Sequence, residues 1–175
     1  QDNLEAIKWF RIAAEQGKAK AQAMLGYMYG EGKGVPQDNL EAVKWYRKAA
    51  KQGYVIAQLH LGSMYHNEGD LKDYKEALKW YRKAAKLGYA KAQFNLGLMY
   101  LKGQGVPRDN KEAAKWHRKA ANQGNVNAQI ALGLMYVKGI EVPQDYKIAL
   151  KWLYRAAYQE NAKAQFNLGI MYEKG

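Results

Sequence analysis

The chain has 175 residues, a net charge of +12 and no cysteine, so disulfide bonds and thiolate metal sites are excluded. Helix-forming residues are abundant and only three prolines occur, a composition that favours an all-helical protein. No run of about 18 apolar residues is present, so we expect no transmembrane segment.

Tryptophan recurs along the chain at a nearly constant interval. The tryptophans stand at positions 9, 45, 80, 116 and 152, so the successive spacings are 36, 35, 36 and 36 residues. The glycine of a Leu-Gly pair keeps the same interval, at positions 26, 62, 97, 133 and 169. A fixed period of this length is typical of a solenoid, in which each unit buries its apolar face only against its neighbours. We therefore expect a single repeat domain over residues 1–175, with about five units.

The two ends of the sequence are expected to lie in incomplete units. The chain opens on the second helix of a unit, which carries Trp9, and it ends on a first helix, which carries Gly169. We therefore expect a fragment of a longer array. Helices without a neighbouring repeat expose apolar faces, so end-to-end self-association through the uncapped terminal helices is a further expectation.

The second helices of the units are expected to begin with acidic and end with basic residues. This order recurs over residues 38–53, 73–86 and 109–119, where it complements the helix dipole. Aspartates recur once per unit as candidate helix caps, at positions 38, 73, 109 and 145. Glu41 with Lys44, Glu76 with Lys79, and Glu112 with Lys115 form i,i+3 pairs. We interpret these basic helices as solvated outer faces.

One unit, residues 90–124, illustrates the expected elements. A first helix is predicted over 90–102, with a core stripe of Ala92, Leu96, Met99 and Tyr100. Gly97 lies within that helix, which indicates close contact with a packed neighbouring helix. A glycine-rich turn follows, and a second helix after Asp109 carries Trp116 and His117 on its apolar side before Gly124 ends it. His117 stands where other units have Tyr46 and Tyr81, so we interpret it as a packed aromatic substitute.

The motifs AQAMLGYMY at residues 21–29 and EAVKWYRKAA at residues 41–50 resemble the Sel-one-like repeat, a relative of the tetratricopeptide repeat. The resemblance covers nearly the whole chain. It implies an all-α fold, an α/α superhelix built as a right-handed solenoid of helix-turn-helix repeats of about 36 residues. It also implies that the first helices line the concave face and that the protein is an adaptor without a catalytic site. The turn at residues 68–73 departs from the pattern, because it lacks Gly-Val-Pro and is one residue shorter.

If this geometry holds, the first helices carry apolar residues that lie off the core stripe, on the concave face. These residues are Phe94, Leu98 and Leu101, then Ile130, Leu134 and Val137, then Phe166 and Ile170. Asn95, Asn167, Lys91 and Lys163 could border them with polar groups. Contiguous exposed apolar surface usually marks an interaction site, so we hypothesise a groove for an extended or helical segment of a protein partner. The alternative is that superhelical curvature buries these residues against the next repeat.

Residues suited to catalysis are scarce in this sequence. Ser63 is the only serine and threonine is absent, so a hydroxyl nucleophile would depend on one residue. His60 and His66 are six residues apart, a spacing that points them to different sides of a helix. We therefore expect no enzymatic activity, no metal site and no cofactor.

Three functions remain open on this sequence. The favoured one is a protein–protein interaction scaffold that binds a partner protein or peptide in the concave groove. The second is binding to an anionic surface, nucleic acid or membrane, through the basic outer helices; nucleic acid is the less favoured partner. The third is a structural spacer within a longer array. Binding to phosphate groups should weaken steeply with salt, which separates the second function from the first.

Overall fold

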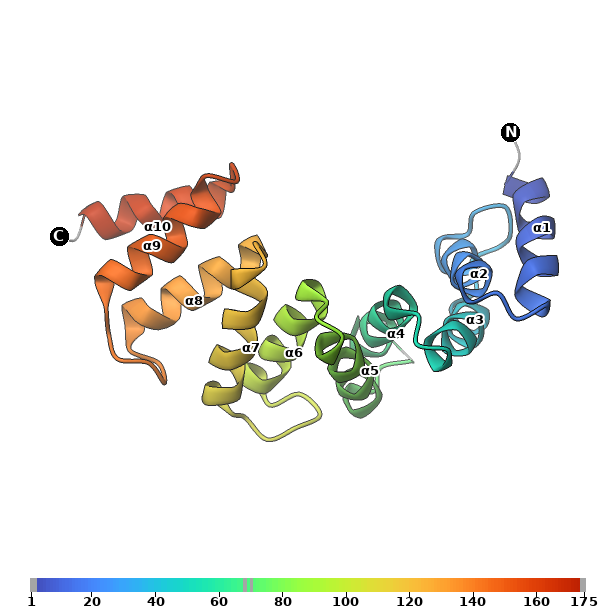
Figure 1. The fold of residues 1–175 in the computed structure, drawn as a ribbon, viewed down its shortest axis with the longest axis horizontal. Helices are drawn as coiled ribbons and strands as arrows, with labels where there is room; N and C mark the ends of the chain where they lie inside the picture. Colours follow the sequence, from blue (N-terminus) through green and yellow to red (C-terminus); the bar gives the residue numbers. More distant parts are fainter. Residues whose placement is uncertain (1–2, 68, 70, 174–175) are drawn as a thin grey trace. The chain divides into compact units, whose positions relative to one another are not determined.

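The computed structural model describes residues 3–67, 69 and 71–173, and this part of the chain consists of α-helices joined by short turns (Figure 1). Over these residues there are ten helices and no strand, as the sequence predicts. Their bounds are α1 Asn3–Glu15, α2 Ala19–Glu31, α3 Asn39–Lys51, α4 Val55–Asn67, α5 Tyr74–Lys86, α6 Ala90–Lys102, α7 Asn110–Asn122, α8 Val126–Lys138, α9 Tyr146–Ala157 and α10 Ala162–Glu173.

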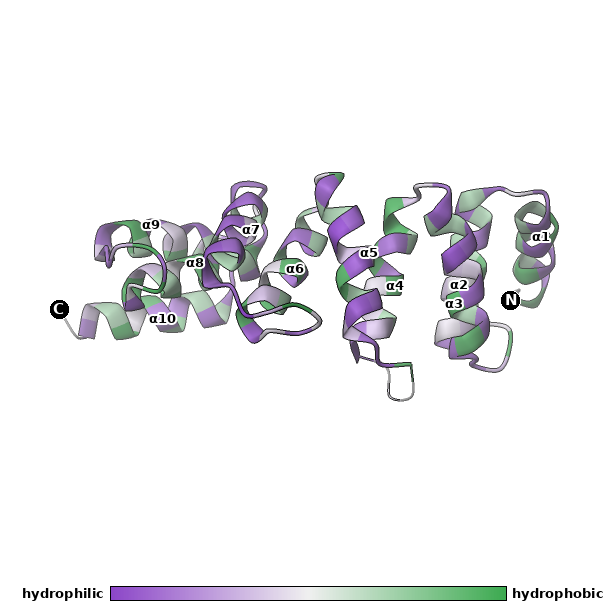
Figure 2. Ribbon diagram, turned by 90° about the horizontal axis from the view of Figure 1, so that it is seen from below, coloured by the Kyte–Doolittle hydropathy of each residue, from purple (hydrophilic) through white to green (hydrophobic). Residues whose placement is uncertain are grey.

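The chain divides into two compact units, Gln1–Leu87 with α1 to α5 and Gly88–Gly175 with α6 to α10. In the first unit α2 packs on α3 and α4 packs on α5; in the second, α6 packs on α7 and α8 on α9 (Figure 1). Each of these pairs is a first helix followed by its second helix. Hydrophilic stretches are prominent on the second helices α5 and α7 in Figure 2.

A glycine in the first helix lets each pair approach closely. A Cβ atom added to Gly62 would lie 2.5 Å from the ring of Tyr81, and one added to Gly97 would lie 2.6 Å from the ring of His117. Gly26 meets Tyr46 in the same way, at 2.7 Å. Real Cβ contacts are essentially never this short, so a larger residue would force the facing ring to shift. The expected close contact at Gly97 is confirmed.

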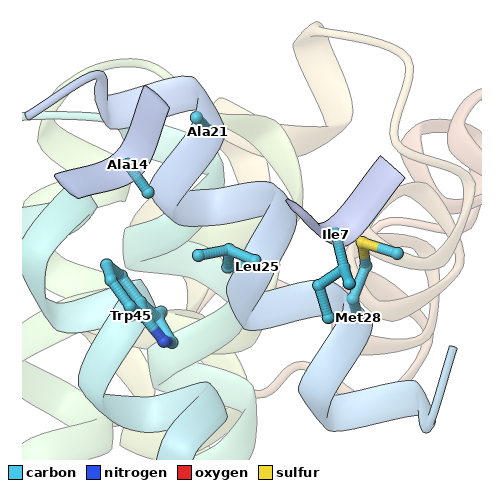
Figure 3. Close-up of a cluster of buried hydrophobic side chains, with 6 residues drawn as sticks. All are labelled: Ile7, Ala14, Ala21, Leu25, Met28 and Trp45. Carbon is cyan, nitrogen blue, oxygen red and sulfur yellow. The ribbon is translucent and has the colours of Figure 1, made fainter. Parts of the chain in front are cut away.

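The core of each unit lies between neighbouring helices. In the first unit, Leu25 and Met28 of α2 pack with side chains of α1 and α3; Figure 3 shows this cluster of Ile7, Ala14, Ala21, Leu25, Met28 and Trp45. In the second unit, Trp152 packs with Leu132 and with alanines of α7 and α8. The tryptophans at positions 45, 80, 116 and 152 are all buried, which agrees with a structural role for this series. Trp9 of α1 is exposed.

The predicted caps and ion pairs are present. The carboxylate of Asp38 accepts a hydrogen bond from the amide of Glu41, and Asp73, Asp109 and Asp145 cap α5, α7 and α9 in the same manner. The pairs Glu41–Lys44, Glu76–Lys79 and Glu112–Lys115 have N–O distances of 2.6, 2.7 and 2.9 Å. Of the shortened turn before α5, Glu68 and Asp70 lie outside the described residues.

Within each unit, buried glutamines of the first helices make the linking hydrogen bonds, either to the preceding second helix or to the residue that follows the second helix of the same pair. Gln22 Nε2 donates to the carbonyl oxygen of Ala14 (3.0 Å), and Gln22 Oε1 accepts from Gln52 Nε2 (2.8 Å). The second contact recurs between Gln123 and Gln93 (2.8 Å) and between Gln159 and Gln129 (3.0 Å). Gln58 lacks this second contact, because Leu87 stands at the position where the other repeats have the donor glutamine.

Candidate functional site

A cavity of about 300 Å³ lies in the second unit, lined mainly by α6 and α8. Its walls are largely apolar. The lining residues are Phe94, Leu98 and Leu101 of α6, His117 of α7, Asn127, Ile130, Ala131, Leu134, Met135 and Lys138 of α8, Ile140 of the following turn, and Lys163 of α10.

Helical periodicity explains how α6 serves both the core and the cavity. The buried stripe of Ala92, Leu96 and Met99 belongs to the core. Phe94, Leu98 and Leu101 are offset from it by two residues, or about 200° around the helix, and follow each other at i, i+4 and i+7, so they form a second stripe on the opposite side of the helix. This second stripe lines the cavity and is half-buried.

Six of the twelve site residues that the sequence suggested line this cavity. Leu98 and Leu134 are half-buried and border the open space, so adjacent helices do not bury them. Ile130 also lines it but is only 4% exposed, because it packs in a core cluster with Leu153 and Leu168. It therefore forms part of the wall, and Leu98 and Leu134 offer more accessible surface. The other lining residues from that set are Phe94, Leu101 and Lys163.

The remaining six suggested residues do not line the cavity. Phe166 of α10 is 69% exposed, and Ile170, four residues later, is half-buried. The side-chain nitrogen of Asn167 is buried and has no hydrogen-bond partner among the described residues. The others are Val137 and Asn95, which are half-buried, and Lys91, which is exposed.

His117 forms the part of the cavity wall that α7 contributes. Its ring lies against Gly97 and 5.4 Å from the ring of Phe94, centroid to centroid. The side chain is fully buried, and neither ring nitrogen has a hydrogen-bond partner within the described residues. Burial lowers the pKa of His117 to about 4, so the imidazole is neutral at physiological pH. It is a packed ring, as its place in the repeat suggested.

The charged groups of the cavity wall are basic. Lys138 and Lys163 are exposed residues that line it, and no aspartate or glutamate does. Lys138 was missed by sequence reasoning, although it follows Leu134 at i+4 and so continues the same stripe. Asn127, Ala131, Met135 and Ile140 were also missed; Met135 had the pattern of a core residue.

The corresponding place in the first unit is smaller and more polar. A pocket of about 140 Å³ lies there, with Tyr27 and Glu31 of α2 and His60 and Ser63 of α4 in its wall. His60 stacks on Tyr46 with ring centroids 5.0 Å apart. At this place in the first unit, the described residues thus form a smaller and more polar pocket than the cavity of the second unit.

Two other kinds of site find no support in the described part of the chain. No group of three or more His, Asp or Glu side chains is gathered as a metal site would require. None of the described helices is both long and apolar enough to cross a membrane.

Comparison with known proteins places the chain in a family. The Sel1 repeat model matches it in six consecutive segments, residues 1–18, 19–54, 55–89, 90–125, 126–161 and 162–175. No curated protein gives a significant match.

Several solved structures are similar over most of this chain. A protective antigen from uropathogenic Escherichia coli strains, which displays an SLR fold, is 44% identical with a TM-score of 0.93, over 97% of this chain and 36% of that one. A Sel1 repeat protein from Oxalobacter formigenes is 41% identical with a TM-score of 0.84, over 92% of this chain and 64% of that one. The chain thus spans less than two thirds of the length of either protein. It belongs to the Sel1 repeat family, and its fold is the all-α repeat superhelix of that family.

Proposed function

We propose that this chain is a protein-interaction scaffold that takes up a segment of a partner protein in the cavity lined by α6 and α8. Sel1 repeat proteins are generally protein-interaction scaffolds, which supports the first part of the proposal. The observation that carries the proposal is the placement of Leu98 and Leu134. Both leucines are only half-buried and both border the same apolar cavity.

The size of the cavity suits side chains of a peptide. At about 300 Å³ it lies at the lower end of the range for ligand sites. Space of this order accepts one or two large apolar side chains. Binding energy in protein interfaces concentrates on such anchors when they enter a well-packed pocket, so a short segment is enough to dock here.

The basic outer helices are a weaker candidate for the binding surface, because much of their charge is already engaged. Lys48 lies over the ring of Trp45 at 4.0 Å, and Lys119 lies over that of Trp116 at 4.5 Å. Lys115 is paired with Glu112. These contacts stabilise the helices themselves. They therefore explain why basic residues occur on the outer helices without the need for an anionic binding partner.

Affinity capture from a lysate of the source cells tests the proposal. The native chain is compared with a Leu98→Gln, Leu134→Gln double variant of confirmed helicity. We expect a protein captured by the native chain to be lost with this variant. A control variant, Leu4→Gln with Leu40→Gln, changes two exposed leucines of the first unit that lie away from the cavity, and it should capture the same protein. Equal capture by all three chains, abolished at high salt, would instead favour an anionic ligand on the outer helices.

A further inference from the structure

We infer that the segment bound in the α6–α8 cavity is acidic, with a large apolar side chain flanked by aspartate or glutamate. The inference rests on the proposed function and specifies its partner.

Lys138 and Lys163 bring two positive charges to the cavity from two different helices. Both line it, and both are exposed. No acidic side chain lines it. A lysine can lay its aliphatic stem along an apolar wall while its ammonium group stays in water, so an apolar site with a cationic rim results.

Several lysines of the outer helices have a protein partner, whereas these two have none among the described residues. Within the described residues, neither Lys138 nor Lys163 takes part in an ion pair, a hydrogen bond or a cation–π contact. Lys115, by contrast, is 2.9 Å from a carboxylate oxygen of Glu112, and Lys119 lies over the ring of Trp116. The charges at the cavity therefore remain available to a ligand.

The second unit as a whole would attract an anionic segment. Residues 88–175 hold 13 Lys or Arg against 6 Asp or Glu, a net charge of +7. A field of this sign speeds the encounter with an acidic partner. When the apolar anchor enters the cavity it also displaces water near the rim, where a carboxylate–ammonium contact gains strength over a fully solvated pair. Apolar burial and charge pairing thus favour the same kind of ligand.

Selection from a displayed library of random peptides tests this directly. The native chain of 175 residues is the bait, and the enriched peptides are synthesised and their affinities measured by fluorescence anisotropy. We expect enrichment of one large apolar residue with neighbouring Asp or Glu. Reversing both cavity charges, Lys138→Glu with Lys163→Glu, should weaken these peptides at least about tenfold. Selection on that variant should favour Lys or Arg instead.

Matched variants separate the inference from the proposed function. Lys147→Glu with Lys151→Glu makes the same change in net charge on exposed residues of α9 that do not line the cavity, and it should change affinity less than about threefold. The inference would be overturned if the enriched peptides show no preference for Asp or Glu and the charge reversal at the cavity leaves their affinity unchanged. The scaffold function would still stand if Leu98→Gln with Leu134→Gln weakens the binding of these peptides. Ala131→Gln narrows the cavity without changing its charge. It therefore replaces the leucine double variant in this comparison if that variant unfolds. Enriched peptides that ignore every cavity variant, or a selection that enriches none, would overturn both.

Discussion

Replacing Leu87 with glutamine should stabilise the first unit, because it supplies a hydrogen bond that the other repeats already have. Gln58 Nε2 donates to the carbonyl oxygen of Ala50 (3.2 Å), but Gln58 Oε1 is buried and has no hydrogen-bond partner among the described residues. In the preceding repeat the equivalent oxygen, of Gln22, accepts from Gln52. Leu87 follows α5 with φ −77° and ψ 5°, nearly the values of Gln52 after α3 (−80° and 4°). A glutamine at 87 would therefore start from the same backbone position.

The expected gain is modest and measurable. A hydrogen bond to a buried acceptor contributes about 1 kcal/mol net. Removing the leucine costs little apolar burial, because Leu87 is 63% exposed in the folded chain. In a chain of this length, that free energy raises the Tm by about 2–4 °C.

Urea denaturation and thermal melting, both followed by circular dichroism, measure the effect. Leu87→Met is the matched control, since methionine has a similar length but no donor, and it should leave the stability unchanged. The reverse substitution, Gln52→Leu, should destabilise by about 1–3 kcal/mol, because Gln22 Oε1 loses its donor. If Leu87→Gln is no more stable than Leu87→Met, the linking glutamines are not a source of stability and the reasoning fails.

Three further predictions concern glycines inside helices, the buried histidine and two glutamates with positive φ. Gly97→Ala should destabilise by about 1–3 kcal/mol, because its Cβ would overlap the ring of His117; Gly169→Ala, which meets nothing within 4 Å, should instead stabilise by up to about 1 kcal/mol, and chemical denaturation ranks the two. His117 has a pKa of about 4 in the folded chain and about 6.5 when unfolded. Its contribution to stability is therefore complete above pH 6.5 and is lost as the pH falls towards 4, by about 3 kcal/mol; unfolding of His117→Tyr measured across this range should lack that component. Glu141 and Glu160 have positive φ angles of 55° and 58°, so Glu141→Gly and Glu160→Gly should each stabilise by about 1 kcal/mol; Ala at either site retains the strain, and an equal gain from Ala would contradict the assignment.

The helices could be predicted closely from the sequence because their end signals are local. The predicted helix over 90–102 coincides with α6, which Gly103 ends in a left-handed conformation. The aspartate caps and the i,i+3 pairs were equally predictable, since each depends on residues within one turn of a helix. The close approach at Gly97 followed from the cost of a glycine inside a helix.

The cavity was only partly predictable, because its shape depends on which side chains meet across helices. Phe94 and Ile130 occupy equivalent positions, yet Phe94 is half-buried beside His117 while Ile130 joins the core with Leu153. The period of the repeat does not tell these two cases apart. Lys138 was missed for a simpler reason, since a lysine in the last turn of α8 also suits the helix dipole.

The linking glutamines also bear on how the chain acquires its structure. The side-chain hydrogen bonds that they make join residues no more than 35 positions apart. Chains whose contacts are this local close only short loops during folding, and they fold quickly. Because similar contacts recur between neighbouring helices within each unit, folding can begin at more than one helix pair and spread from there. On the ribosome, an amino-terminal pair would already have its partners before the rest of the array is synthesised.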